Sequence, residues 1–329
     1  MNILITGGTG FIGSRLALRC LEGGDAVLIF GQVNTPAEVE NRKLLESRGA
    51  AVILGSVTDR DRVIDVLQGI DVVYHLAAAQ HEANVPDQRF WDVNVTGTRN
   101  LLEASVKAHV QRFLYGSTIG VYGSAGHAPI TNDSPLQPDN IYGVTKLAAE
   151  NLVLSFQQEM PVVIIRISET YGPGDHRLLK LFKAIKKNVF FMVGSGRNLH
   201  HIIYIDDLIE GLLLSTMVKE AVGKIFVLAG NEPITTNTIV TTIANHLGVS
   251  IRRFRAPLFP FLILAAILEA TLRPLGIQPP LHRRRMDFFT KSFAFSLEHP
   301  TKVLGFTPRY NFNQGIAETL RWYSEMNYL

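Results

Sequence analysis

A tyrosine and a lysine, Tyr142 and Lys146, stand four residues apart in a segment whose pattern predicts a helix over about 139–158. Residues at this spacing lie on one helical face, so the phenol and the ammonium point the same way. A free tyrosine has a pKa near 10, which is too high for a base at neutral pH. Lowering that pKa by about 3 units takes roughly 4 kcal/mol of differential stabilisation of the phenolate, which nearby cations supply. The pair therefore indicates acid–base chemistry, although the spacing alone is common and its meaning depends on the surrounding fold.

Three glycines at three-residue spacing, Gly7, Gly10 and Gly13, follow a short apolar strand at 2–5 and precede an apolar helix pattern that starts at Phe11. Gly7 permits the positive φ of a tight turn, Gly10 lets a pyrophosphate approach the backbone, and Gly13 lets the helix pack close to the strand. The phosphates then meet the free N–H groups at the positive end of the helix. In this strand–turn–helix context the triplet predicts a dinucleotide site.

Two hydroxyl residues, Ser117 and Thr118, follow a predicted strand that begins at Arg112. Ligands of a parallel sheet bind beyond the carboxyl ends of its strands. Either hydroxyl is therefore a candidate to hydrogen-bond a substrate hydroxyl or carbonyl. The alternative is ordinary turn chemistry at the end of a strand.

Apolar strands and helices alternate along the first half of the chain, and the strands are continuous runs of Val, Ile and Leu. This pattern is typical of a parallel sheet covered by helices on both faces. The expected strands are 2–5, 26–30, 51–54, 71–75, 112–115 and 162–165, and the expected helices begin at 11, 36, 59, 86 and 139, the fourth running to about 109. After 166 the alternation loosens into a smaller lobe over the sheet edge. There, helices are expected near 178–187, 206–217, 235–246 and 258–272, and strands near 202–205 and 224–228.

The chain has 329 residues, of which 47% are hydrophobic and 19% are charged, as in an ordinary globular protein. A net charge of +3 is too small and too evenly spread to indicate nucleic-acid binding. With Cys20 as the single cysteine, no internal disulfide framework exists and a reducing, cytoplasmic location is expected. No metal site is predicted, because the adjacent His200 and His201 point apart on an extended segment.

Together these motifs resemble the extended short-chain dehydrogenase/reductase family, often called NAD-dependent epimerase/dehydratases. The resemblance covers essentially the whole chain and rests on 6–13, 75–78, 94–98, 117–118 with 122–123, 142–146, 166 with 171–174, and 204–207. It implies an α/β fold, a Rossmann-type doubly wound parallel sheet with a smaller, discontinuous α+β substrate lobe, and usually a homodimer. The Rossmann domain would comprise 1–168 plus about 202–230, and the substrate lobe about 169–201 plus 231–329.

By the same resemblance, Tyr142 is the acid/base, and Lys146 binds the nicotinamide ribose and lowers the pKa of Tyr142. Thr118 matches the catalytic hydroxyl residue, with Ser117 beside it, and Asn94 matches a helix asparagine that supports the site. The shared step is hydride transfer between C4 of the nicotinamide of NAD or NADP and a secondary alcohol or ketone. The expected cofactor contacts are Gly7, Gly10, Phe11, Ile12, Gly13, Gly31, Gln32, Ser56, Val57, Leu76, Ala77, Ala78 and Lys146.

The ribose-recognition position after the second strand departs from the family pattern. It reads Phe-Gly-Gln at 30–32, with neither the acidic residue that holds the NAD ribose nor the arginine that holds the NADP phosphate. Weak discrimination between the cofactors, with a slight preference for NAD, is therefore expected. The candidates to take over recognition of the ribose are Asn34, Thr35, Arg42 and Lys43.

Two further departures concern the substrate. Glu169 stands where nucleotide-sugar enzymes of the family usually have asparagine, and His200 stands where they often have an arginine that contacts a nucleotide diphosphate. Thr118, Glu169 and His200 are the candidate substrate contacts. The favoured reaction is that of a nucleotide-sugar epimerase or dehydratase. The alternative is a dehydrogenase or reductase acting on an apolar, sterol-like or polyprenoid alcohol, as in the 3β-hydroxysteroid dehydrogenase branch.

An apolar segment at 258–272 carries the similarity to that second branch. It is shorter than the roughly 20 residues that a membrane span needs. We interpret it as a helix packed over a substrate pocket. The alternative is a peripheral membrane-surface contact, supported by the nearby Arg283, Arg284 and Arg285.

Overall fold

The computed structural model describes the chain except for residues 81–84, 125–128, 252–253, 273–276, 278, 280 and 282. Its centre is a seven-stranded parallel sheet with the strand order β11-β6-β5-β4-β1-β2-β3. The strands are β1 (Asn2–Thr6), β2 (Ala26–Gly31), β3 (Ala51–Leu54), β4 (Val72–His75), β5 (Arg112–Thr118), β6 (Val162–Ile167) and β11 (Ile225–Leu228). This arrangement confirms the predicted doubly wound parallel sheet.

Both faces of the sheet are buried, which explains why its strands are continuous apolar runs. Within β1, Ile3 and Ile5 belong to one hydrophobic cluster while Leu4 belongs to another, because alternate side chains of a strand point to opposite faces. The helices that contribute to the first cluster include α1 (Phe11–Glu22), α2 (Pro36–Ser47) and α8 (Ile205–Met217). Those that contribute to the second include α3 (Arg60–Val66), α5 (Gly97–Lys107) and α6 (Ile141–Ser155).

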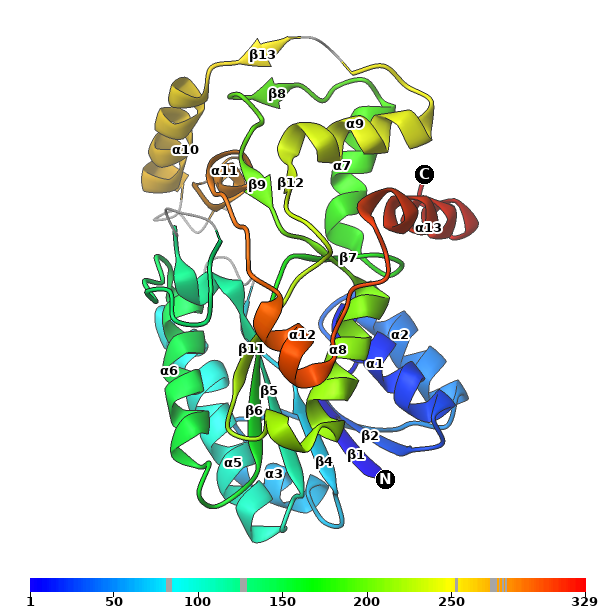
Figure 1. Cartoon of the computed structure of the whole chain (residues 1–329), viewed down its shortest axis with the longest axis vertical. Helices are drawn as coiled ribbons and strands as arrows, with labels where there is room; N and C mark the ends of the chain where they lie inside the picture. The colour runs from blue at the N-terminus through cyan, green and yellow to red at the C-terminus, as the bar shows by residue number, and fades with distance from the viewer. Residues whose placement is uncertain are drawn as a thin grey trace.

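The strands run toward a second group of elements that lies beyond their carboxyl ends (Figure 1). Its helices are α7 (His176–Lys186), α9 (Thr236–Leu247), α10 (Leu258–Leu272), α11 (Arg283–Thr290) and α13 (Phe312–Glu325). Three short strand pairs accompany them: β7 (Thr170–Tyr171) with β10 (Ile203–Tyr204), β9 (Leu199–His200) with β12 (Ile234–Thr235), and β8 (Met192–Val193) with β13 (Arg255–Ala256). The helix α12 (Glu298–Leu304) packs beside the edge strand β11.

The helix expected over 86–109 is interrupted. It consists of α4 (Asp87–Trp91), a π-helical turn η1 (Asp92–Thr96) and α5. A π-turn inserts an extra residue into the helical ladder and is frequent at functional sites, and this one contains Asn94. Hydrophobic periodicity does not reveal such an insertion, because the flanking turns keep their apolar faces.

Helices α11, α12 and α13 were not predicted, and neither were the two-residue strands apart from β10, which lies within the strand expected at 202–205. The strands are too short to show a period, and α11 begins with three charged residues rather than an apolar pattern. None of the helices in the described part of the chain has the length and apolarity that a bilayer crossing requires.

Candidate active site

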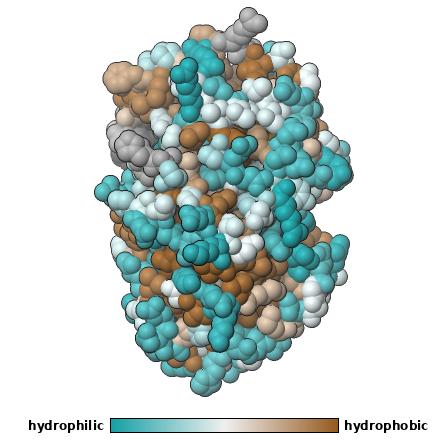
Figure 2. All heavy atoms as spheres, viewed as in Figure 1, coloured by the Kyte–Doolittle hydropathy of each residue, from teal (hydrophilic) through white to brown (hydrophobic). Residues whose placement is uncertain are grey.

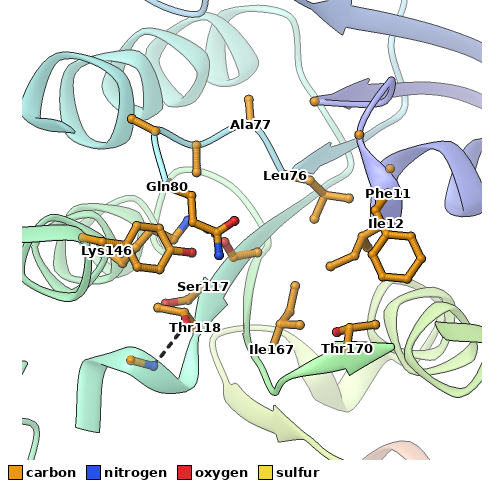
Figure 3. Close-up of a pocket in the computed structure, with 18 of the residues that line it drawn as sticks. Phe11, Ile12, Leu76, Ala77, Gln80, Ser117, Thr118, Lys146, Ile167 and Thr170 are labelled. Atoms are coloured by element: carbon orange, nitrogen blue, oxygen red, sulfur yellow. Dashed lines mark hydrogen bonds between the residues drawn. The ribbon is translucent and has the colours of Figure 1, made fainter. Parts of the chain in front are cut away.

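A cavity of about 640 Å³ opens at the carboxyl edge of the sheet, where the strand order reverses between β1 and β4. Ligands of doubly wound sheets bind at this switch point. All of the residues predicted for the site line this cavity except Asn94, which is buried behind it. Figure 3 shows Phe11 and Ile12 on one side of the cavity and Ser117, Thr118 and Lys146 on the other. Residues from segments far apart in the chain therefore line one continuous cavity.

The glycine turn between β1 and α1 has the shape that a pyrophosphate requires. Gly7 has φ +70°, and a Cβ at Gly13 would lie 2.4 Å from the carbonyl oxygen of Gly7. The N–H groups in the first turn of a helix have no intrahelical partner. Among the described residues, no side chain caps the start of α1 at Gly10 either. Gly10, Phe11 and Ile12 line the cavity, which leaves those N–H groups available for an anion. The residues present therefore fit a dinucleotide.

The part of the cavity that follows β2, where the sequence analysis expects ribose recognition, contains an acidic residue that the sequence analysis missed. Gln32, Asn34 and Glu38 line it together. Glu38 Oε2 accepts hydrogen bonds from the backbone N–H groups of Asn34 (2.5 Å) and Thr35 (3.1 Å), which completes a capping box at the start of α2. The Thr-x-x-Glu spacing signals such a box, and this signal would have found Glu38. The described lining does not include Thr35, Arg42 or Lys43.

Lys146 is almost fully buried, with 1% of its surface exposed. Its Nζ donates to the backbone carbonyl of Gly116 at 2.6 Å and lies 4.1 Å from the centre of the Tyr115 ring. Burial lowers the pKa of Lys146 to about 7, while the Glu150 carboxylate opposes the shift. This ammonium is therefore poised to lose its proton near neutrality unless another negative group joins it.

Tyr142 lies in the first turn of α6 and Thr118 lies at the end of β5, and both line the cavity. The Asn140 side chain accepts from the N–H of Gly143 at 2.9 Å, so it caps the helix that carries Tyr142. The Thr118 hydroxyl oxygen accepts from the N–H of Gly120 at 3.1 Å, the bond dashed in Figure 3. Its proton remains available to a ligand, because this bond uses the oxygen as an acceptor.

The hydroxyl of Ser117, unlike that of Thr118, donates its proton to another side chain of the protein. Its Oγ donates to Glu150 Oε1 at 2.5 Å, and Glu150 forms a fully buried ion pair with Arg166. Arg166 also donates to the Tyr122 hydroxyl at 2.7 Å. Because a carboxylate can only accept, the Ser117 proton is committed to Glu150. Glu150 was not singled out from the sequence, although it is a charged residue four positions after Lys146.

Asn94 connects the wall of the cavity to α6. Its Oδ1 accepts from the N–H of Ala79 at 2.8 Å, and its Nδ2 donates to the Ala79 carbonyl at 3.1 Å and to Thr145 Oγ1 at 3.0 Å. Asn94 is buried, so these bonds are shielded from water. It thus fixes the backbone after β4 relative to the helix that carries Tyr142.

His75 extends this network under the cavity. Thr98 donates to the carbonyl of Asn94 at 2.7 Å, so its oxygen must accept from Nε2–H of His75, which lies 2.8 Å away. His75 Nδ1 then accepts from the hydroxyl of Thr6 at 2.7 Å. Burial, together with the ammonium of Lys146, lowers the pKa of His75 to about 3. The ring is therefore neutral at physiological pH and acts as a fixed spacer between β1, β4 and α5.

The two residues that depart from the nucleotide-sugar pattern contact each other. Nδ1 of His200 lies 2.9 Å from Glu169 Oε2, and His200 is buried while 47% of the Glu169 side chain is exposed to the cavity. Desolvation would raise the pKa of Glu169, but the hydrogen bond and charge of His200, with the charge of Arg177, hold it below its ordinary value. The cavity therefore presents a carboxylate at this point.

The neighbouring His201 faces elsewhere. Its Nδ1 accepts from the N–H of Phe295 at 2.9 Å, and its Nε2 donates to the carbonyl of Gly230 at 2.8 Å. No group of three potential metal ligands gathers anywhere in the described residues.

The model of the family described as "NAD dependent epimerase/dehydratase family" matches residues 3–229. This chain belongs to that family. It is 27% identical to a dTDP-glucose 4,6-dehydratase of Streptomyces niveus over 99% of this chain and 93% of the relative. It is also 28% identical to the N-acetyl-alpha-D-glucosaminyl-diphospho-ditrans,octacis-undecaprenol 4-epimerase of Escherichia coli O157:H7, over 98% and 95%. Among solved structures it resembles the UDP-glucuronic acid 4-epimerase of Bacillus cereus in complex with NAD, with a TM-score of 0.81, 25% identity and 99% of each chain covered.

Membership confirms the resemblance to the extended short-chain dehydrogenase/reductases and makes the protein an NAD(P)-dependent enzyme. When bound, the dinucleotide supplies a carbon that accepts or donates a hydride. The chain must therefore bind the dinucleotide, orient a substrate beside it and move a proton.

Proposed function

We propose that this enzyme transfers a hydride to and from a secondary hydroxyl carbon of a nucleotide sugar, as an epimerase or a dehydratase. The observation that carries the proposal is the polar wall that residues following β6 contribute to the cavity. Glu169, His200, Asp287 and Lys291 line it, and Lys291 forms ion pairs with Asp139 at 2.6 Å and Asp287 at 3.4 Å. Such a wall suits the hydroxyl groups of a sugar, which need partners when they leave water.

In this proposal Tyr142 is the acid/base, and Lys146 binds the ribose and holds the phenolate. Thr118 donates to the substrate oxygen, and Asn94 positions the helix that carries Tyr142. Ser117 acts through Glu150, because its proton is already donated there. We also propose that 1–168 plus 202–230 hold the dinucleotide and that 169–201 plus 231–329 hold the substrate. The second set supplies the cavity residues Glu169, Thr170, Arg177, His200, Asp287, Phe288, Lys291 and Phe293.

The relatives point to the same substrate class. Their names contain dTDP-glucose, UDP-glucuronic acid and a diphospho-undecaprenol sugar, and in each of these compounds a sugar is joined to a diphosphate. The alternative, an apolar alcohol, required α10 to line the cavity. Of the described lining residues none comes from α10, because α11 lies between α10 and the cavity. The apolar helix is therefore no argument for a sterol.

A ligand panel tests the substrate class. With NAD present, UDP-glucose, UDP-glucuronic acid or dTDP-glucose should raise the melting temperature, because a ligand that binds the folded state stabilises it. The ligand that does so should then be converted, and product analysis distinguishes an epimer from a dehydrated keto sugar. Stabilisation and oxidation of a 3β-hydroxysterol, with none of the nucleotide sugars active, would overturn the proposal.

A second expectation concerns the choice of cofactor. Glu38 places a carboxylate at the ribose end of the cavity, where the 2′-phosphate of NADP would meet like charge. We expect NAD to bind at least about tenfold more tightly than NADP, a difference of about 1.4 kcal/mol. Glu38→Gln keeps an acceptor for the capping box but removes the charge, so this variant should lose most of the preference. Titration of both cofactors measures it.

Glu40→Gln is the matched control, because Glu40 lies on the same helix and does not belong to the described cavity lining. It should keep the ratio of wild type. Equal affinities for both cofactors in the wild-type protein would show that Glu38 does not act on the ribose.

A further inference from the structure

Helix α10 carries a stripe of large apolar side chains that face outward. The exposed fractions are 71% for Phe259, 45% for Ile263, 46% for Leu264 and 53% for Ile267. Positions 259, 263 and 267 are four residues apart and therefore share one face of the helix. Figure 2 shows hydrophobic residues at the upper left of the molecule, where Figure 1 draws α10. We call these four residues the α10 stripe.

The opposite face of α10 is anchored. Phe261, Leu262 and Ala265 belong to a hydrophobic cluster that includes Met286 and Phe289 of α11. One face of the helix thus packs against the protein, while the opposite face, which is also apolar, remains exposed. A helix that is hydrophobic on all sides is normally buried in protein or lipid, and exposed apolar patches mark interaction surfaces.

The segment around α10 is strongly basic. Between 252 and 287 the sequence contains seven arginines and two acidic residues, Glu269 and Asp287. Three of the arginines, at 283–285, begin α11, which packs against α10. Arg255, in β13, directly precedes the α10 region and is exposed. An apolar face within a basic segment is the composition of helices that lie in the headgroup region of anionic membranes.

We propose that the α10 stripe docks on the surface of an anionic lipid bilayer. A second copy of the chain fits this surface less well, because a twofold contact would bring two basic segments together. The 15 residues of α10 extend about 22 Å, too short to cross the roughly 30 Å hydrocarbon core. The helix therefore lies in the plane of the interface, with its anchored face toward the protein.

This docking has a consequence for the active site. Asp287 and Phe288 of α11 line the cavity, while Met286 and Phe289 of the same helix pack in the α10 cluster. One helix thus separates the lipid surface from the substrate side of the cavity. Docking would hold that side of the cavity beside the bilayer. The docking itself does not depend on the reaction that the enzyme catalyses.

Co-sedimentation of the full-length protein with vesicles tests the proposal. The protein should bind vesicles of phosphatidylcholine containing phosphatidylglycerol, bind pure phosphatidylcholine vesicles more weakly, and dissociate progressively as salt is added. The double variant Ile263→Glu/Ile267→Glu should reduce the vesicle-bound fraction at least about tenfold, because each charge opposes burial in lipid. Both substitutions lie on the exposed face, and thermal unfolding should show that the variant remains folded.

Met217→Glu is the matched control, since Met217 is 64% exposed but belongs to α8. It should bind vesicles as the wild type does. Analytical ultracentrifugation provides the second measurement. Absence of binding to either kind of vesicle, or a dimer that the double variant dissociates while vesicles have no effect, would overturn the proposal.

Discussion

Tyr142→Phe should lose at least about a hundredfold in turnover while it still binds NAD. A hydride cannot leave a secondary carbinol carbon unless the hydroxyl proton leaves as well, so a base must stand at that oxygen. Removal of a general base typically costs 10²–10⁴-fold in rate. Tyr142 lines the cavity with Lys146 and Thr118, and no other described tyrosine does so. The measurement is single-turnover reduction of bound NAD, followed by absorbance, with the substrate found in the ligand panel.

Tyr74→Phe is the matched control for this experiment. Its hydroxyl contacts Thr216 at 2.7 Å, and it lies outside the described lining of the cavity. This variant should lose the hydrogen bond to Thr216 but keep the turnover of wild type. If Tyr142→Phe also turned over like wild type, the acid/base assignment would be wrong.

The sequence predicted the sheet and the main residues of the cavity because both depend on local signals. Buried parallel strands require continuous apolar runs, and the glycine triplet requires its strand and helix on either side. Once those elements are placed, Thr118 and Tyr142 must come to the same edge of the sheet, since the carboxyl ends of parallel strands meet there. No spatial information beyond the order of the elements was needed.

Other parts of the site depend on contacts between distant segments. The hydrogen bonds of His75 with Thr6 and Thr98 join three elements, and no spacing within one element indicates them. The contact between Glu169 and His200 joins residues 31 positions apart. The sequence marked both as departures from a pattern, but it gave no reason to pair them. The position of α10 likewise depended on α11, a helix without an apolar pattern of its own.

Gly10→Val should reduce the affinity for NAD at least about a hundredfold, or about 2.7 kcal/mol, while the protein stays folded. Gly10 has φ −71° and ψ 175°, a conformation that valine adopts readily. Among the residues that the structure describes, a Cβ at this position would meet only the Gly7 carbonyl oxygen, at 3.3 Å, so the turn needs to move by a few tenths of an ångström. The rest of the valine side chain would enter the cavity at the N–H groups of α1 to which we assign the pyrophosphate.

Gly13→Ala provides the contrast, because at Gly13 the added carbon would lie 2.4 Å from the Gly7 carbonyl oxygen and 2.7 Å from Gly8 Cα. Such contacts are repulsive, so this variant should lose thermal stability as well as NAD binding. Gly10→Val should melt close to wild type in the absence of cofactor and gain none of the stabilisation that NAD gives the wild-type protein. Comparison of the two variants thus distinguishes a glycine that the fold requires, Gly13, from a glycine that cofactor binding requires, Gly10. Calorimetric titration measures the affinity for NAD. If a folded Gly10→Val protein bound NAD with the affinity of wild type, the assignment of the pyrophosphate to this turn would be wrong.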